Sequence, residues 1–335
     1  MKRYKRVLAV LAGTTMIVSS MTACGSGGDT KSTGSNSEYP ELNLSMAVNG
    51  TDTQIDTQVG QKLAELVSEK SGGNITIDVF PNDTLAGGNA TKGIEYVCAG
   101  STDLAAYATS TLSAIDPLLN IATTGGEYYA DELDDKGLTY LGAFHNGFRQ
   151  LTNSKHAVTK PDDLKGLKIR IPGSEIYMTF WQAVGASPTA MSWSEVFTAI
   201  QQGTIDGQEN GVPITDSAKM YEVQKYLTFW NYCYDADLVI ANSKVWDSLD
   251  EKTQDLLKEC IAEACEWGND KIVEDEKTLI EKFKDNGMQV DELTDEQLEP
   301  FKELIKAPMN EIKAKYGKDA CEAFGIDTEG VKFSN

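Results

Sequence analysis

The N-terminal third of the chain alternates strand-like and helix-like segments, and this alternation limits the possible folds more than any other feature. Residues 42–48 and 74–80 alternate apolar and polar side chains as strands do, and residues 102–108 read as a third, shorter strand. Between them, residues 56–70 are amphipathic, and residues 92–100 read as the end of a second helix. A β-α-β-α-β order predicts a parallel sheet with helices on its faces.

A second α/β block and a helical C-terminal part follow. The expected elements are strands at 139–144, 167–171, 225–233 and 237–242, and helices at 175–184, 193–202, 250–285 and 294–315. A helix over 250–285 exceeds the ~8–20 residues that are usual in globular proteins, and we expect it to span two domains. A chain of this length also suits two hydrophobic cores rather than one.

The first 23 residues have the pattern of a secretory signal. Basic residues at positions 2–6 precede a short apolar core at 7–18, which is too short to cross a bilayer as a helix. The sequence MTAC, ending at Cys24, resembles a bacterial lipobox, in which the cysteine is lipid-modified; free secretion is the alternative. Residues 24–38 are rich in Gly, Ser and Thr and predict a flexible tether. We therefore expect an extracytoplasmic protein whose contact with the membrane is a lipid anchor.

The charge and the cysteines exclude several classes of protein. The chain has 51 Asp and Glu residues against 30 Lys and Arg, four of which lie in the signal segment. Such a surface repels phosphate backbones, so no nucleic-acid partner is expected. Five cysteines follow Cys24, an odd number without a C-x-x-C motif. We interpret them as buried free thiols, with a single bridged pair as the alternative.

Motifs of catalysis and of metal or cofactor binding are not evident in the sequence. The chain has two histidines, His145 and His156, and lacks the H-E-x-x-H, G-x-S-x-G, P-loop and dinucleotide-binding patterns. The acidic residues of TIDGQEN (204–210) are interpreted as part of a turn at Asp206-Gly207. We expect no enzyme, no cofactor and no metal; a secreted enzyme remains the least favoured of the alternatives.

Arginine is rare and placed close together. After the signal segment the chain has 24 lysines but only two arginines, Arg149 and Arg170, 21 residues apart. A guanidinium group matches a carboxylate with two parallel hydrogen bonds, which a lysine ammonium does not. Arg170 lies near the end of strand LKIRI, where ligands of α/β proteins bind. The pair predicts an anion site between two domains; a structural salt bridge with one of the acidic residues is the alternative.

The sequence around these arginines resembles a known family. The segments are NGFRQLTN (146–153), DLKGLKIRIP (163–172), the run from Gly185 to Gly211 that contains GASPTAM and IDGQEN, and YEVQKYLT (221–228). They are similar to the substrate-binding proteins of tripartite ATP-independent periplasmic (TRAP) transporters, of the dicarboxylate-binding (DctP) type. The resemblance runs from about residue 40 to the C-terminus. It implies a two-domain periplasmic-binding-protein-like α/β fold with a ligand cleft between domains and a long helix spanning both.

The resemblance also implies roles for individual residues. Arg170 matches the arginine that pairs with the ligand carboxylate, and Arg149 matches a second arginine of the same cleft. Asn210 matches an amide that hydrogen-bonds the ligand from the opposite wall. Trp193 takes the place of a phenylalanine that packs near the bound acid, and Asn49 matches a polar residue of the other domain.

Four further residues are candidates with structural alternatives. Tyr107, Thr109 and Ser110 follow the third strand and offer hydroxyl groups to a ligand; ordinary capping of the strand end is the alternative. His145 precedes NGFRQ and is expected to face the cleft, or else to be a hydrogen-bonded structural residue.

These expectations define a solute-binding protein. The resemblance implies a monomer that captures an organic acid and presents it to the membrane subunits of a TRAP transporter. The ligand is expected to be a sugar acid such as a uronate, or a four-carbon dicarboxylate. A binding protein of another transporter class or a sensor is the alternative. We expect domain I to comprise residues 39–146 plus 236–275, and domain II residues 147–235 plus 276–335.

Overall fold

A computed structural model describes residues 38–120 and 126–333, which belong to one compact unit. The signal segment, Cys24 and nearly all of the predicted tether lie outside the described residues. The strands form one nine-stranded sheet in the order β2-β1-β3-β8-β4-β7-β5-β6, with β9 paired to β8. Their bounds are β1 Leu42–Val48, β2 Ile75–Phe80, β3 Leu104–Ala108, β4 Leu138–Asn153, β5 Lys168–Ile171, β6 Ser187–Ala190, β7 Gly207–Gly211, β8 Tyr226–Asn242 and β9 Gln289–Glu292.

The sheet has two parallel parts joined by two long strands. β1 pairs in parallel with β2 and β3, and β5 pairs in parallel with β6 and β7. Between these parts, β4 and β8 pair with each other in antiparallel fashion over most of their length. This arrangement confirms two α/β lobes. The expectation of separate strands at 225–233 and 237–242 was wrong, because both segments belong to β8. Asp235 lies between them and interrupts the apolar pattern from which a continuous strand would be predicted.

Helices cover both faces of the first parallel part. On one face, α1 (Ile55–Lys70) and α9 (Glu251–Asp285) bury Val59, Leu63, Leu257 and Ile261 against alternate residues of β1. On the other face lie α2 (Ala90–Ala99), α4 (Gly126–Asp134) and α11 (Lys318–Ala323). This sandwich is the architecture that the β-α-β-α-β pattern predicts.

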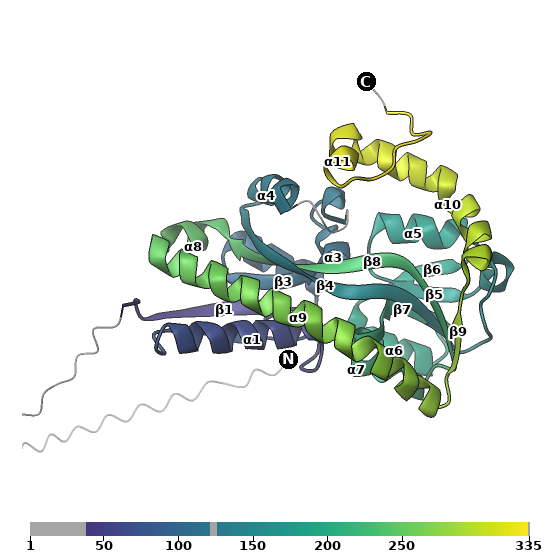
Figure 1. Ribbon diagram of the computed structural model, residues 1–335, viewed down its shortest axis with the longest axis horizontal. Helices are drawn as coiled ribbons and strands as arrows, with labels where there is room; N and C mark the ends of the chain where they lie inside the picture. Colours follow the sequence, from purple (N-terminus) through teal and green to yellow (C-terminus); the bar gives the residue numbers. More distant parts are fainter. Residues whose placement is uncertain (1–37, 121–125, 334–335) are drawn as a thin grey trace, which may run out of the picture. The chain divides into compact units, whose positions relative to one another are not determined.

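The long helix α9 connects the two lobes. Its N-terminal part lies in the core of the first lobe, whereas Phe283 near its C-terminal end packs with Val212 and Leu227 of the second lobe. Figure 1 shows α9 crossing both halves of the sheet. The prediction of a two-lobe helix is therefore confirmed. In the second lobe, α5 (Glu175–Ala183) and α10 (Asp295–Tyr316) enclose an aromatic core with β5. Helices α6 (Trp193–Gln201) and α7 (Val212–Ser217) pack in two smaller clusters of the same lobe.

Strand β7 was not predicted, because its sequence GQENG contains no apolar side chain. It lies between β4 and β5, and all five of its residues are buried. A Cβ atom on Gly207 would lie 2.4 Å from the carbonyl oxygen of Thr152, and one on Gly211 would lie 2.4 Å from that of Asn146. Glycine at both ends therefore permits the close approach of β4, and the segment expected to be a turn becomes a central strand.

Two further expectations concern the domains and the cysteines. The proposed domain boundaries stay a prediction, and α11 departs from them: Ala320 and Phe324 pack into the first-lobe core beside Leu238 and Ile240, although 276–335 was assigned to domain II. The cysteines of the described chain are all free thiols, as preferred from the sequence, but only Cys260, Cys265 and Cys321 are buried; Cys98 and Cys233 are half-buried.

Candidate functional site

Two adjoining cavities lie between the lobes, at the carboxyl ends of the parallel strands. The first has a volume of about 300 Å³ and is lined by residues that follow β1, β2 and β3 of one lobe and β5 and β6 of the other. The second, of about 50 Å³, shares with it Asn49, Ser110, Thr111, Arg170, Pro172 and Trp193. We call the two cavities together the cleft. The carboxyl ends of strands are where α/β sheets bind ligands.

Arg170 lies at the end of β5 with its cation inside the cleft. The residue is 5% exposed, its Nε donates to the carbonyl oxygen of Met191 at 3.0 Å, and its guanidinium carbon lies 5.2 Å from the centre of the Trp193 ring. Among the described residues no carboxylate pairs with it, and no acceptor bonds its two terminal nitrogens. Burial, together with the charge of Arg149, lowers the pKa of Arg170 to about 10. A buried cation with free donors beside a cavity is suited to receive an anion.

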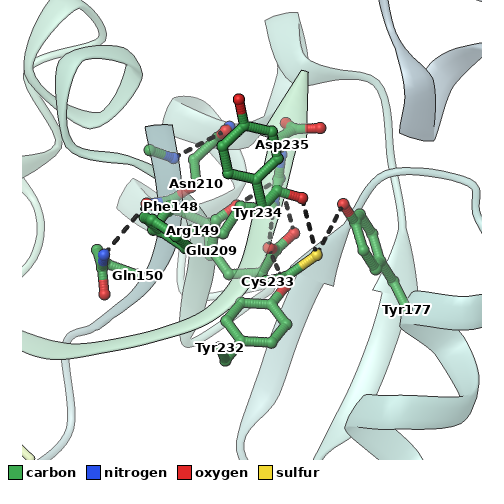
Figure 2. A network of polar contacts seen from close by, with 12 residues as sticks. Phe148, Arg149, Gln150, Tyr177, Glu209, Asn210, Tyr232, Cys233, Tyr234 and Asp235 are labelled. Carbon is green, nitrogen blue, oxygen red and sulfur yellow. Dashed lines mark hydrogen bonds and ion pairs between the residues drawn. The ribbon is translucent and has the colours of Figure 1, made fainter. Parts of the chain in front are cut away.

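Arg149 is held by protein carboxylates. Its Nε and Nη2 donate to the two carboxylate oxygens of Glu209 at 2.5 and 2.9 Å, and its Nη1 donates to Asp235. Burial disfavours its charge, but Glu209 and Asp235 outweigh burial and raise the pKa of Arg149 well above its ordinary value. Figure 2 shows this network, in which the Tyr232 hydroxyl also donates to Glu209. The two arginines therefore differ: Arg149 is neutralised by the protein, and Arg170 is not.

The wall that the first lobe contributes to the cleft is acidic. Asp83 follows β2 and accepts hydrogen bonds from the Tyr107 hydroxyl at 2.7 Å and from the side-chain amide of Asn49. Asp56 lies in the first turn of α1 and accepts from the backbone N–H of Gly50 at 2.6 Å. These bonds fix two carboxyl groups at the surface of the cleft.

Two more acids reach the cleft from β8. Asp235 pairs with Arg149, and Asp237 accepts from the Asn146 amide at 3.2 Å. The Oδ1 atoms of Asp235 and Asn146 are buried and have no hydrogen-bond partner in the described part of the chain. With Glu209 behind Arg149, the site thus sets five carboxyl groups around two guanidinium groups.

The acidic wall makes the stability of the unliganded protein depend on pH. Burial raises the pKa of Asp56 from 3.8 to about 6, and burial also raises the pKa of Asp83. Burial and the charge of Asp56 raise the pKa of Asp237 well above its ordinary value. A carboxyl group with a higher pKa in the folded state stabilises that state below its unfolded pKa, and this contribution is lost as the pH rises through the folded value.

We therefore expect the unliganded protein to melt several degrees higher at pH 5 than at pH 7.5. The full shift of the Asp56 pKa from 3.8 to about 6 corresponds to about 3 kcal/mol, and about half of this is lost between pH 5 and pH 7.5. Differential scanning calorimetry at both pH values measures the effect, and Asp56→Asn should reduce the difference because the titrating group is removed. A melting temperature that rises from pH 5 to pH 7.5 contradicts the expectation.

The structure brings six of the nine predicted ligand contacts to the cleft. Arg170, Trp193, Asn49 and Ser110 line both cavities, and Arg149 and Asn210 line the second. The Trp193 ring lies on the guanidinium of Arg170, so one of its faces orients the arginine rather than a ligand. Direct contact of these residues with a ligand stays a prediction.

Tyr107 and Thr109 lie off the cavity walls. Both are buried, and Tyr107 reaches the cleft only through its hydrogen bond to Asp83. Strand β3 ends at Ala108, and the short helix α3 (Thr109–Leu112) follows directly. Ala108, Ser110 and Thr111 line the cleft, whereas Tyr107 and Thr109 are buried away from its walls. A sequence of consecutive hydroxyl-bearing residues does not show which of them face the cleft and which are buried away from it.

His145 also lies off the cavity walls, in contact with the long helix. Its backbone N–H donates to Asn269 Oδ1 at 2.8 Å, its Nε2 lies 3.2 Å from the Asn269 carbonyl oxygen, and its ring stacks on Tyr234. Burial lowers its pKa. These contacts fit the structural alternative, in which His145 ties β4 to α9.

The acids of the cleft were missed from the sequence. Asp83 had a usable signal, because it follows a predicted strand in the sequence PND, and both Asn82 and Asp83 adopt positive φ angles of 56° and 50°. Asp56 follows the first strand by a short loop and could have been found in the same way. Asp237 and Asn146 lie within long strands, where no local signal marks a residue that turns toward a cleft.

Neither metal sites nor membrane spans were found in residues 38–120 and 126–333. No group of three or more His, Cys, Asp or Glu side chains is arranged there to hold a metal ion. No helix in the same residues is long and apolar enough to cross a membrane.

The chain matches a family model over most of its length. Residues 44–125 and 120–315 match DctP, bacterial extracellular solute-binding protein, family 7. The chain is 30% identical over 286 residues to the 2,3-diketo-L-gulonate-binding periplasmic protein YiaO of Escherichia coli (strain K12), covering 80% of this chain and 85% of YiaO. It is 29% identical over 276 residues to the C4-dicarboxylate-binding protein DctB of Bacillus subtilis (strain 168), covering 77% of this chain and 78% of DctB.

A solved structure supports the same relationship. The sugar acid binding protein DctPAm of Advenella mimigardefordensis strain DPN7T, in complex with galactonate, superposes with a TM-score of 0.80 at 26% identity, covering 85% of this chain and 97% of that chain. The fold described above is therefore the fold of a solved solute-binding protein.

Proposed function

The chain belongs to the DctP family of bacterial extracellular solute-binding proteins, the binding components of TRAP transporters, and we propose that it captures a sugar acid or a four-carbon dicarboxylate between its lobes. Proteins of this family bind and deliver a solute and catalyse no reaction. The proposed partners are the membrane subunits of a TRAP transporter, which receive the acid from the closed protein.

The observation that carries the proposal is the unpaired guanidinium of Arg170. In this strongly acidic protein, a buried arginine without a carboxylate partner is costly unless a ligand neutralises it. Each charge-assisted hydrogen bond contributes about 1.5–3 kcal/mol, so a bidentate pair supplies a large part of the ~8 kcal/mol that micromolar binding requires. Trp193 covers the guanidinium and helps to hold it in the orientation that such a pair needs.

The other lining residues suit the rest of an organic acid. Asn49 and Ser110 from the first lobe and Asn210 from the second offer amide and hydroxyl groups to a ligand that lies between the lobes. A ligand in contact with both lobes stabilises their approach, because it binds the closed arrangement better than the open one. The segments that cross from lobe to lobe, β4, β8 and α9, are the proposed hinge.

Binding of organic acids tests this function directly. Isothermal titration calorimetry and thermal-shift measurements with D-glucuronate, D-galacturonate, D-gluconate, D-galactonate, succinate and fumarate should identify at least one acid that binds. At a concentration of about 100 times the dissociation constant, the ligand should stabilise the protein by about 2.7 kcal/mol. Neutral sugars of the same size are the matched control, since they lack the carboxylate. If no acid binds, or the neutral sugars bind equally well, the proposal is wrong.

We further propose that Cys24 carries the lipid anchor, because it ends the MTAC motif of the signal segment. We expect Cys24→Ser to release most of the protein from the membrane fraction of its own bacterium, since the thiol that would carry the lipid is lost. Quantitative immunoblotting of the membrane and soluble extracytoplasmic fractions measures the change, with Ser26→Ala as control. Retention of the Cys24→Ser protein in the membrane fraction contradicts the anchor and leaves solute binding unaffected.

A further inference from the structure

The charged groups of the cleft are divided between its two sides. The second lobe supplies the cation of Arg170 at the end of β5, and the first lobe supplies Asp56 and Asp83, which follow β1 and β2. Asp237 adds a carboxyl group from β8. The hydrogen bonds of Arg149 go to Glu209 and Asp235 rather than to these three acids, although its charge lowers the pKa of Asp237.

Because of this division, the two ends of a bound ligand meet opposite charges. A single carboxylate on Arg170 completes an ion pair that the protein leaves open. A second carboxylate at the opposite end would lie against Asp56 and Asp83 in a buried site, where like charges repel strongly. Asp237, whose pKa is raised well above its ordinary value, adds to this repulsion when it is ionised. The cleft therefore accepts one anionic group and resists two.

The acidic side of the cleft has buried acceptor atoms that a ligand could pair with hydrogen-bond donors. Asn146 is 5% exposed and Asp235 is 1% exposed, both line the second cavity, and the Oδ1 atom of each has no partner among the described residues. Ionised carboxylates only accept hydrogen bonds. The same cavity is lined by the amides of Gln54 and Asn210, which both donate and accept. Hydroxyl groups of a ligand both donate and accept hydrogen bonds, so they match this mixture of carboxyl and amide groups, whereas an ammonium group only donates.

We propose that the ligand is a hydroxylated monocarboxylate, such as a uronate or an aldonate, whose carboxylate pairs with Arg170 and whose hydroxyl groups donate to the acidic wall of Asp56, Asp83 and Asp237. This inference rests on the proposed function and selects between its two ligand classes. The acidic wall is the specificity determinant against dicarboxylates.

The test compares three classes of acid on the unaltered protein and on Asp56→Asn, Asp83→Asn and Arg170→Lys. Isothermal titration calorimetry at pH 7.5 measures D-glucuronate, D-galacturonate, D-gluconate and D-galactonate against succinate and against 4-aminobutyrate. We expect at least one hydroxylated acid to bind tenfold or more tightly than succinate and 4-aminobutyrate. The Asp→Asn variants should bind this acid at least fivefold more weakly, and their affinity for succinate should stay constant or increase.

The outcomes separate this inference from the proposed function. Tighter binding of succinate or 4-aminobutyrate than of every hydroxylated acid overturns the inference. Equal weakening of all acids by Asp56→Asn and Asp83→Asn also overturns it, because a merely structural role of the wall would act on every ligand alike; melting curves of the variants show whether they are folded. If one of these two results is found and Arg170→Lys still weakens binding of the acids, the carboxylate site at Arg170 is supported while the inference about the acidic wall fails. If no acid binds, the proposed function itself fails.

Discussion

Replacing Arg170 by lysine should lower the affinity for the bound acid at least tenfold while the protein stays folded. The positive charge remains in this variant, but the planar fork that forms two parallel hydrogen bonds with a carboxylate is lost. The stacking of the guanidinium on the Trp193 ring and its bond to the Met191 carbonyl are lost as well. Arg170→Met should weaken binding further, because it also removes the charge.

Calorimetric titration of the variants with the tightest acid of the panel measures the loss. Lys168→Arg is the matched control, since Lys168 lies two residues earlier on β5 and is exposed to solvent. An unchanged affinity of Arg170→Lys would contradict the assignment of Arg170 as the carboxylate receptor. The unliganded Arg170→Met protein should melt no lower than the unaltered one, because burial of an unpaired cation disfavours the folded state.

The sequence predicted the position of Arg170 by general rules of α/β structure. The period-two pattern of LKIRI separates Arg170 from its apolar neighbours Ile169 and Ile171, and the strand ends at the edge of the sheet where ligands bind. Asn49 and Ser110 also follow strands of the other lobe, but Asn49 was assigned from the resemblance to the family and Ser110 as one of three hydroxyl-bearing candidates after the third strand. Residues at strand ends are predictable because a short-range pattern fixes both the strand and its end.

The partners of Arg149 could not be predicted, since they depend on pairing between distant segments. Glu209 lies in β7, whose polar sequence did not indicate a strand, and Asp235 lies in the middle of β8. Arg149 meets both only because β4 lies between β7 and β8 in the sheet. A lone sequence with 51 acidic residues offers no means of choosing these two. The same limit concealed Asp237, which reaches the cleft from within a long strand.

The geometry of Arg149 predicts a large loss of stability when the residue is changed. Arg149→Met should lower the free energy of unfolding by about 3–5 kcal/mol, because it leaves Glu209 and Asp235 buried without their cation. At about 2–4 °C per kcal/mol for a chain of this size class, the melting temperature should fall by about 10 °C. Urea unfolding of the ligand-free protein, followed by circular dichroism, measures the loss of stability. Arg170→Met serves as the matched control, since that arginine has no buried carboxylate to leave behind.

A compensating variant distinguishes lost charge pairing from lost packing. Glu209→Gln and Asp235→Asn, combined with Arg149→Met, remove the uncompensated carboxylates while nearly preserving the size of each side chain. The triple variant should regain at least half of the stability that Arg149→Met loses, because buried charges that lose their partner cost more than neutral groups in the same place. If the triple variant is no more stable than Arg149→Met, packing of Arg149 against Tyr177 dominates instead. Recovery of stability without recovery of acid binding would assign Arg149 a second role at the ligand, which its place in the wall of the second cavity allows.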